Sequence, residues 1–228
     1  MNLVGVSKIR AVILDYGEVL CHPPTAEEFG RMVGVFAVDP DSFRQLWERN
    51  RGLYDRGDLT PQAYWSKLAE DAKVKVAPEQ LEQLCEWDVE MWAHPNPNMI
   101  EWLKQIHAAG IKTAILSNMH PDMIGYARKN FKWLKYFDHH TFSAEIRLIK
   151  PDPAIYEHSL RGLGVPPSDA LFVDDREQNI KAAQALGIRS IQFRSMAQFR
   201  NDLEKLGFPI LPMDAKPASP APQVGAVL

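Results

Sequence analysis

The chain has 228 residues, which is long for one minimal domain and short for two full ones, so an α/β core with a smaller inserted or appended unit fits best. Hydrophobic residues make up 46% and charged residues 24%, which supplies ample material for a buried core. The formal net charge of -3 argues against nucleic acid as a main partner, because such partners normally require a basic stripe. No apolar run reaches the roughly 18 residues that a membrane-spanning helix needs, so we expect no membrane partner.

The chain contains two cysteines, Cys21 and Cys85, and neither belongs to a CxxC pair. Two thiols in a chain of this size do not make a disulfide framework, so both are expected to be structural and the protein to work in a reducing cytosol. Residues 1–10 also lack the apolar stretch of a signal peptide. A cytoplasmic location is therefore the expectation.

The first predicted element is a strand at residues 11–14, a short continuous apolar run that is typical of a parallel sheet covered on both faces. Residues 25–92 then show helical periodicity without strand patterns. Within this stretch, Thr60 is predicted to cap a helix whose first residue is a proline, and Pro78 is predicted to open another. This segment is therefore predicted to be an all-helical insert.

Strands and helices alternate after the Pro-Asn-Pro breaker at residues 95–97. The predicted elements are, in order, a helix at 99–106, a strand at 112–116, a helix at 123–129, strands at 140–142 and 170–173 around a helix at 154–163, a helix at 179–186 and a strand at 190–193. This rhythm predicts βαβ units and a parallel sheet. Residues 213–228 are rich in proline and alanine and are predicted to be disordered.

Polar residues follow three of the predicted strands at the point where each strand ends. Asp15 follows the first strand, Ser117 and Asn118 follow the second, and Asp174 and Asp175 follow the strand at 170–173. Because parallel strands all point the same way, these groups are expected to converge at one carboxyl edge of the sheet, where open α/β sheets bind ligands.

Three carboxylates in one pocket, together with Lys150, indicate a metal site. Carboxylates at close quarters repel one another unless a cation lies between them, and an all-oxygen site suits a hard ion such as Mg²⁺. Taken singly, each residue has an ordinary interpretation: an aspartate after a strand usually caps a turn, and a lysine before proline is usually solvated. Their conjunction at successive strand ends favours the functional interpretation.

These segments resemble the four motifs of the haloacid dehalogenase superfamily, which match here at residues 15–20, 116–118, 150–151 and 172–175. The resemblance covers roughly residues 10–195. Further segments, 56–60 with Trp65, 153–156 and 176–180, resemble the subgroup of small bacterial phosphatases that hydrolyse glucose 1-phosphate, and the phosphatase-type N-terminal domains of epoxide hydrolases.

The resemblance implies an α/β fold with a Rossmann-like core and parallel sheet, formed by residues 1–20 and 96–212, and an inserted all-helical cap at residues 21–95. It also implies that Asp15 is the nucleophile, which attacks phosphorus to form an aspartyl-phosphate. Mg²⁺ would be bound by Asp15, by the backbone carbonyl of Gly17 and by the Asp174 and Asp175 pair.

The remaining residues of the implied site bind the phosphate group. The Ser117 hydroxyl and the Asn118 backbone N–H would hold phosphate oxygens, and Lys150 would stabilise Asp15 and the charge of the transferring group. The implied partner is a small-molecule phosphate ester.

One position departs from the superfamily pattern. Many of its phosphatases carry a second aspartate two positions after the nucleophile, as general acid and base, whereas this chain has Gly17. The metal contact needs only the backbone carbonyl and so survives the change. Glycine at this position occurs in the subgroup that the chain resembles, and the missing acid favours a good leaving group such as the anomeric oxygen of a sugar 1-phosphate.

Weaker candidates lie outside the four motifs. Five residues of the helical insert or its hinge are candidates for contact with the leaving group: His22, Arg51, Tyr54, Asp55 and Trp65. The adjacent pair His139-His140 is rejected as a metal-ligand set, because neighbouring residues of a strand point in opposite directions.

Three alternatives compete with a phosphatase. A 2-haloacid dehalogenase would use the same nucleophile on carbon, but enzymes of that type typically lack the pair that Asp174 and Asp175 form here. A phosphoryl mutase would suffer from the missing acid at Gly17. A degenerate binding or regulatory module is supported by Gly17 and opposed by retention of Asp15, Lys150 and both late aspartates.

Overall fold

The structure, a computed structural model, describes residues 9–208 and has a parallel sheet at its centre. Within that range the sheet has five strands in the order β3-β2-β1-β4-β5, and each neighbouring pair is parallel. The strands are β1 (Ala11–Leu14), β2 (Lys112–Ser117), β3 (His139–Phe142), β4 (Ala170–Asp174) and β5 (Arg189–Gln192). Every strand lies within one residue of the bounds predicted from the sequence, and the predicted α/β class is confirmed.

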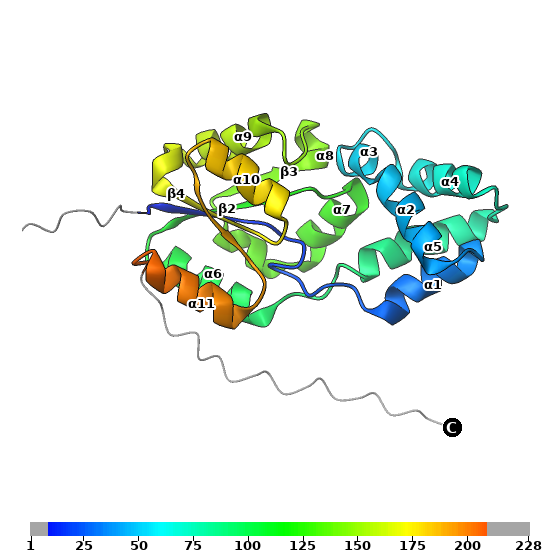
Figure 1. The fold of residues 1–228 in the computed structure, drawn as a ribbon, viewed down its shortest axis with the longest axis horizontal. Coiled ribbons are helices and arrows are strands. Elements are labelled where there is room, and N and C mark those ends of the chain that lie inside the picture. Colours follow the sequence, from blue (N-terminus) through cyan, green and yellow to red (C-terminus); the bar gives the residue numbers. More distant parts are fainter. Residues whose placement is uncertain (1–8, 209–228) are drawn as a thin grey trace, which may run out of the picture.

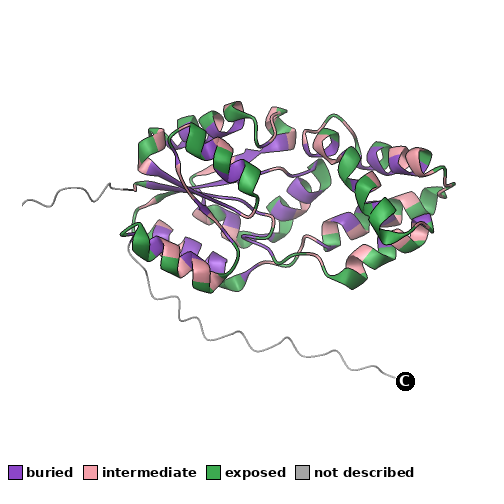
Figure 2. Ribbon diagram, viewed as in Figure 1, coloured by how far each residue is buried: buried purple, intermediate pink, exposed green. Residues whose placement is uncertain are grey.

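Helices cover both faces of the sheet, which explains why the strands are almost continuously apolar. One face packs against α6 (Pro97–Ala108), α7 (Pro121–Asn130) and α11 (Met196–Lys205), and the other against α9 (Pro153–Leu163) and α10 (Glu177–Ala185) (Figure 1). Along β1, alternate side chains enter the two cores, so Val12 and Ile13 pack on opposite faces. Figure 2 shows the buried strands between helices whose outer sides are exposed.

Five helices separate β1 from α6 in the chain and form a group at one end of the molecule (Figure 1). They are α1 (Ala26–Phe36), α2 (Pro40–Arg49), α3 (Arg51–Asp55), α4 (Pro61–Ala72) and α5 (Pro78–Glu90). The group, called the insert below, has a hydrophobic core of its own that includes Phe36, Phe43 and Trp65. The prediction of an all-helical segment between residues 25 and 92 is confirmed.

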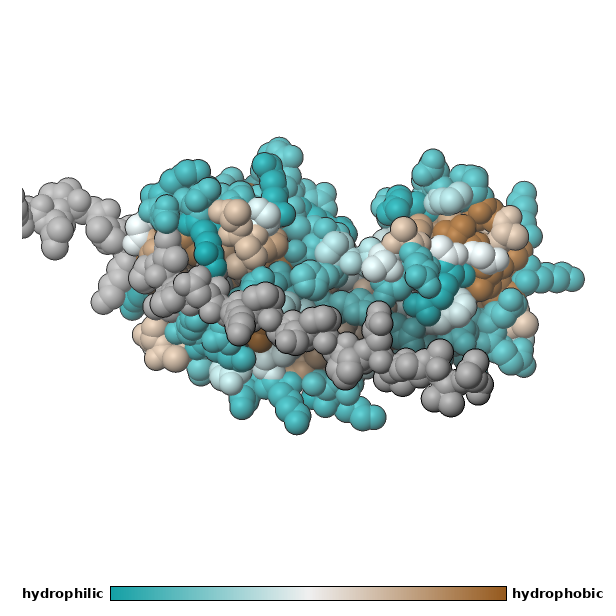
Figure 3. Space-filling model, turned by 90° about the horizontal axis from the view of Figure 1, so that it is seen from below, coloured by the Kyte–Doolittle hydropathy of each residue, from teal (hydrophilic) through white to brown (hydrophobic). Residues whose placement is uncertain are grey.

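The two chain segments that connect the insert to the core run side by side. Cys21 and Pro95 form an isolated antiparallel bridge, the His22 N–H donates to the His94 carbonyl at 2.8 Å, and the Asn96 N–H donates to the Leu20 carbonyl at 2.8 Å. Figure 3 shows a mainly hydrophilic surface on the visible face, with apolar side chains gathered over the insert.

Local sequence signals set most helix starts. The Thr60 hydroxyl accepts the N–H of Ala63 at the start of α4, as predicted, and Pro61 and Pro78 occupy the first helical turns of α4 and α5. Four short or polar elements were not predicted: α8 (Ser143–Ile146), the 3₁₀ helices at Lys132–Tyr136 and Pro167–Asp169, and α11. α11 buries only two side chains, so its apolar signal is weak.

No helix of the described residues is long and apolar enough to cross a membrane. The predicted disordered tail at residues 213–228 lies outside the described residues, as do the first eight residues of the predicted core. Cys21 and Cys85 are both buried, free thiols.

Candidate active site

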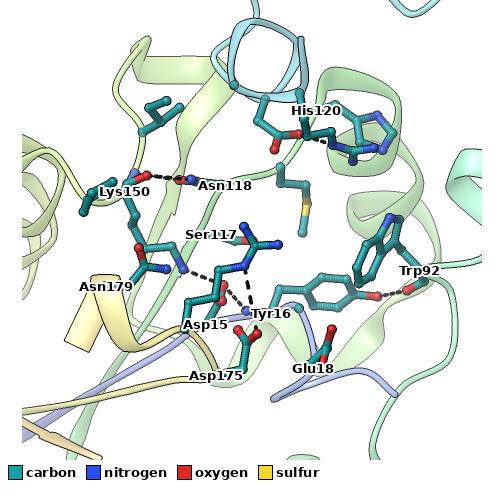
Figure 4. A pocket seen from close by; sticks show the side chains of 18 of the residues that line it. Asp15, Tyr16, Glu18, Trp92, Ser117, Asn118, His120, Lys150, Asp175 and Asn179 are labelled. Carbon is teal, nitrogen blue, oxygen red and sulfur yellow. Dashed lines mark hydrogen bonds and ion pairs between the residues drawn. The ribbon is translucent and has the colours of Figure 1, made fainter. Parts of the chain in front are cut away.

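The carboxyl edge of the sheet brings together the polar residues that follow the strands. Asp15 follows β1, Ser117 ends β2, Asp174 ends β4, and Asp175 comes next in the chain. The parallel register places the ends of β1 and β4 side by side, since the Asp15 N–H donates to the Val173 carbonyl at 2.9 Å. Figure 4 shows Asp15, Ser117 and Asp175 facing one pocket, a cavity of about 510 Å³.

A buried lysine links two of the carboxylates. The Lys150 Nζ lies 2.7 Å from Asp15 Oδ1 and 2.6 Å from Asp174 Oδ2, and all three side chains are buried. Burial alone would lower the pKa of Lys150, but the two carboxylates outweigh it and raise that pKa. The ammonium group is therefore held in its charged form between two acids.

The cluster retains excess negative charge, because three carboxylates surround one ammonium group. Burial and the charges of Asp174 and Asp175 raise the pKa of Asp15 well above its usual range, although Lys150 acts in the opposite direction. Burial and the charge of Asp174 likewise raise the pKa of Asp175 to about 6. A bound cation would relieve this repulsion.

The same three aspartates can supply the ligands of a divalent metal ion. Asp15, Asp174 and Asp175 each offer a carboxylate oxygen, and these oxygens lie within 4.8 Å of one another. The donor set is all oxygen, as Mg²⁺ prefers. Gly17, whose backbone carbonyl was predicted as a further ligand, lines the same cavity. The donor chemistry and the charge excess therefore fit Mg²⁺.

The two late aspartates differ in how far their oxygens are already occupied. Asp174 Oδ1 accepts the Arg176 N–H at 2.8 Å, Asn179 Nδ2 lies 2.9 and 3.0 Å from its two oxygens, and Lys150 holds Oδ2. These donors, Lys150 foremost, hold the pKa of Asp174 below its usual value although burial opposes them. Asp175 has a partly exposed side chain, and among residues 9–208 its carboxylate makes only a distant ion pair, at 4.0 Å, with Arg176. The carboxylate oxygens of Asp175 are therefore more available to a metal ion than those of Asp174.

Asn118 fixes the lysine rather than offering its own side chain to the pocket. Its Oδ1 accepts the Lys150 N–H at 2.8 Å, and its Nδ2 donates to the Lys150 carbonyl at 3.0 Å. This pair of bonds aligns the loop after β2 with the segment that carries Lys150. Ser117 is buried beside them and lines the cavity.

The insert forms the opposite wall of the cavity. Of the weaker sequence candidates, Arg51 and Asp55 line it. Tyr54 and Trp65 are instead buried in the insert's own core, and His22 is exposed and away from the lining. Several further lining residues were not predicted as site residues from the sequence, among them Trp47, Glu48, Trp92, His120, Arg176 and Gln178. His120 directly follows Ser117, Asn118 and Met119 at the end of β2, and this position was the local signal available.

The histidine pair of β3 plays no part in this cavity. The His139 ring packs against the ring of His158, with centroids 5.3 Å apart, and His140 Nε2 lies 3.1 Å from the Leu134 carbonyl oxygen. Neither belongs to the metal-compatible group found among the described residues.

The fold and the aspartate cluster at the sheet edge are those of a hydrolase with a Rossmann-like core. Residues 9–187 match the model of the haloacid dehalogenase-like hydrolases, and the chain belongs to this family. It is therefore a hydrolase, and phosphatases are among its relatives.

Individual comparisons support this assignment. The chain is 30% identical to acyl-CoA dehydrogenase family member 10 of Mus musculus over 223 residues, which cover 90% of this chain and 20% of that protein. It is 30% identical to sesquiterpene phosphatase astK of Aspergillus oryzae over 95 residues, 41% of this chain and 48% of that protein. The chain thus spans less than half the length of these relatives.

A solved structure shares the fold. It is a family enzyme from Bacteroides thetaiotaomicron in complex with magnesium and inorganic phosphate, with a TM-score of 0.66, 23% identity, and coverage of 82% of this chain and 96% of that one. Dehalogenases also occur among the relatives and the fold neighbours. At this identity the structural likeness shows the fold alone.

Proposed function

We propose that the chain is a Mg²⁺-dependent phosphatase that hydrolyses a small phosphate ester through an aspartyl-phosphate on Asp15. The observation that carries this proposal is the Lys150 ammonium group between Asp15 and Asp174, with Asp175 beside them. A nucleophilic carboxylate, a fixed cation and a metal-compatible acid pair at one sheet edge are the parts that phosphoryl transfer needs. The phosphatases among the relatives support the same class.

The proposed reaction has two steps. An Asp15 carboxylate oxygen attacks phosphorus, the ester P–O bond breaks, and the leaving oxygen takes a proton from water. A water molecule then adds to phosphorus of the aspartyl-phosphate, releasing inorganic phosphate and restoring Asp15. Ser117, the Asn118 backbone N–H and Lys150 hold the phosphate oxygens throughout and stabilise the charge that develops on them.

Asp15, the Gly17 carbonyl and Asp175 would hold Mg²⁺, with Asp174 as a more distant member because hydrogen bonds and Lys150 already occupy its oxygens. When bound, the ion would neutralise charge on the transferring phosphate. In this proposal, residues 21–95 act as a cap that excludes water and contacts the leaving group.

The proposed substrate is a sugar phosphate, with preference for a sugar 1-phosphate. The cavity wall offers the indole rings of Trp47 and Trp92, whose flat faces suit the apolar face of a pyranose. It also offers Glu48 and Gln178, whose polar groups can bind hydroxyls. An anomeric oxygen departs more readily than a primary alkoxide, which suits a site without an acid at Gly17.

The test is a substrate screen with and without Mg²⁺, using para-nitrophenyl phosphate, glucose 1-phosphate and 2-chloropropionate. The proposal expects phosphate release that requires Mg²⁺ and no chloride release. Asp15→Asn should reduce turnover at least about 10³-fold while its circular dichroism spectrum stays that of the wild type. Chloride release without phosphate release would instead favour the dehalogenase chemistry found among the relatives.

A further inference from the structure

His120 is a buried polar side chain without a hydrogen-bond partner among the described residues. It is 1% exposed, it lines the cavity, and neither ring nitrogen is hydrogen-bonded. The carboxylate of Asp88 lies nearby, with His120 Nε2 3.8 Å from Asp88 Oδ2, which is beyond hydrogen-bond length. Figure 4 shows His120 across the pocket from Asp15.

An unpaired buried imidazole normally costs stability, so its retention in a cavity wall points to a ligand. Burial lowers the pKa of His120 to about 3, which keeps the ring neutral, with one nitrogen as donor and the other as acceptor. The Tyr54 ring stacks on the imidazole at a centroid distance of 4.5 Å and fixes its plane.

Asp55 lies on the same side of the cavity and is also only partly bonded. Its Oδ1 accepts the Arg51 Nε–H at 3.0 Å, and within residues 9–208 its Oδ2 accepts no hydrogen bond. Arg51 is in turn held by Asp88, with Nη1 3.0 and 3.2 Å from its two oxygens. Two carboxylates therefore share one guanidinium group.

The charge of the side chains that line the cavity disfavours a leaving group that carries a second anion. The lining contains more acids than cations, namely Asp15, Glu18, Glu48, Asp55 and Asp175 against Arg51, Lys150 and Arg176. A second phosphate or a carboxylate on the leaving group would meet this excess of carboxylates. Arg51 and Lys150 are each already held by two carboxylates, and the Arg176 side chain is largely exposed.

We propose that His120 and Asp55 form a recognition site for the hydroxyl groups of a neutral, polyhydroxylated leaving group. A hydroxyl both donates and accepts, so the hydroxyls of such a group can pair with a neutral imidazole nitrogen and with the Asp55 Oδ2. This inference rests on the phosphatase function proposed above and adds the residues that select the substrate. It also disfavours phosphoesters of hydroxy acids and bisphosphates as substrates.

The proposed recognition site is tested by measuring kcat/KM for glucose 1-phosphate, its 2-, 3-, 4- and 6-deoxy analogues, phosphoglycolate and para-nitrophenyl phosphate. The variants are His120→Phe, which keeps a ring against Tyr54 and removes both nitrogens, and Asp55→Asn. The matched control is His140→Phe, because His140 is a half-buried histidine outside the cavity, between the rings of Phe137 and Phe142.

In the wild type, loss of one recognised hydroxyl should lower kcat/KM by about 10–100-fold, the cost of leaving a buried polar group unpaired. His120→Phe should lower kcat/KM for glucose 1-phosphate, relative to that for para-nitrophenyl phosphate, by a similar factor. In this variant, use of the deoxy analogue that lacks the recognised hydroxyl should lower kcat/KM by less than about a further twofold. His120→Phe should keep or raise the melting temperature, since it removes unpaired buried nitrogens, and His140→Phe should leave the ratio unchanged.

Several outcomes would overturn the inference while leaving the phosphatase intact. These are full activity on every deoxy analogue, equal losses on both esters in His120→Phe, or a preference for phosphoglycolate over glucose 1-phosphate. A wild type that releases no phosphate from any ester would instead remove the proposed function, and this inference with it.

Discussion

The Ser143 hydroxyl donates a hydrogen bond to the backbone carbonyl of Asp55 and so joins the core directly to the insert. The same oxygen accepts the Met119 N–H at 2.9 Å, one residue after Asn118. Ser143 is fully buried. One side chain thereby holds the loop that follows β2 against the end of α3, and it fixes the distance between the phosphate end of the cavity and its opposite wall.

Replacement of this hydroxyl should cost both stability and catalysis. Ser143→Ala leaves a buried carbonyl and a buried N–H unpaired, so the free energy of unfolding should fall by about 1–3 kcal/mol. The KM for sugar phosphates should rise, because the backbone of Asp55 is no longer tied to the core. Urea unfolding and steady-state kinetics measure the two effects. Ser159→Ala is the matched control, since the Ser159 Oγ is equally buried but has no hydrogen-bond partner within the described residues. Equal effects of both variants would contradict the proposed link.

The Arg51–Asp55 pair predicts an unusual dependence of stability on pH. Burial raises the pKa of Asp55 to about 6 in spite of Arg51. The folded state therefore binds more protons than the unfolded state between about pH 4 and pH 6, and Asp55 favours folding more as the pH falls through this window. At pH 7.5 its charged form should cost up to about 3 kcal/mol relative to pH 4.

Asp55→Asn isolates this contribution, because the other titrating groups are common to both proteins. The free energy of unfolding of the variant minus that of the wild type should be more positive at pH 7.5 than at pH 4, with the change centred between about pH 4 and pH 6. Denaturant titrations at a series of pH values measure the difference. A difference that stays constant with pH would show that Asp55 titrates normally.

Lys150 is predicted to be essential for folding stability as well as catalysis. Lys150→Met retains much of the side-chain volume but leaves Asp15 and Asp174 buried without a cation, which should lower the free energy of unfolding by about 3–5 kcal/mol. Addition of Asp174→Asn should restore part of the loss, because it removes one of the two orphaned charges. Thermal unfolding of both proteins decides the matter; a double variant no more stable than the single one would show that packing, not charge, is the cause.

The two aspartates of the last motif are predicted to have different roles. Asp175→Ala should weaken Mg²⁺ binding at least about tenfold with a small effect on stability. Asp174→Ala should also weaken binding, but its larger effect should be on stability, because it removes the acceptor for Lys150 and Asn179. Calorimetric titration measures the Mg²⁺ affinity of each variant, and thermal unfolding measures its stability. Unchanged Mg²⁺ affinity in Asp175→Ala would remove it from the metal site.

The sheet and the acidic end of the cavity could be predicted because both depend on local order along the chain. Continuous apolar runs located the strands, and the parallel direction of the strands required Asp15, Ser117 and Asp174 to meet at one edge. No knowledge of tertiary contacts was needed for either step. α11 was missed for a related reason, since its apolar periodicity rests on Phe199 and Leu203 alone.

Of the opposite wall, only Arg51 and Asp55 were candidates from the sequence, because the rest depends on how the insert docks against the core. Trp47 follows the apolar periodicity of α2 and Glu48 resembles any solvated helix residue, so neither pattern indicates a ligand. The side chain of His120 becomes informative only when its burial and missing partners are known. Such residues are defined by tertiary contacts rather than by neighbours in the sequence.

The absence of an acid at Gly17 should affect the choice of substrate. A Cβ at position 17 would lie 3.8 Å from Trp92 Cζ3, an ordinary contact, and Gly17 is not among the residues with a positive φ. Gly17→Asp should therefore fold without backbone strain.

A carboxylic acid at position 17 could protonate the leaving oxygen, a contribution of typically about 10²–10⁴-fold. The poorer leaving group gains more from that proton. The wild type should therefore favour glucose 1-phosphate over glucose 6-phosphate in kcat/KM, and Gly17→Asp should narrow the gap. Gly17→Asn, which has the same shape but no acid, should leave the gap as it is. If the wild type prefers the 6-phosphate, or if both variants change the preference equally, contacts with the insert and not leaving-group chemistry set the choice.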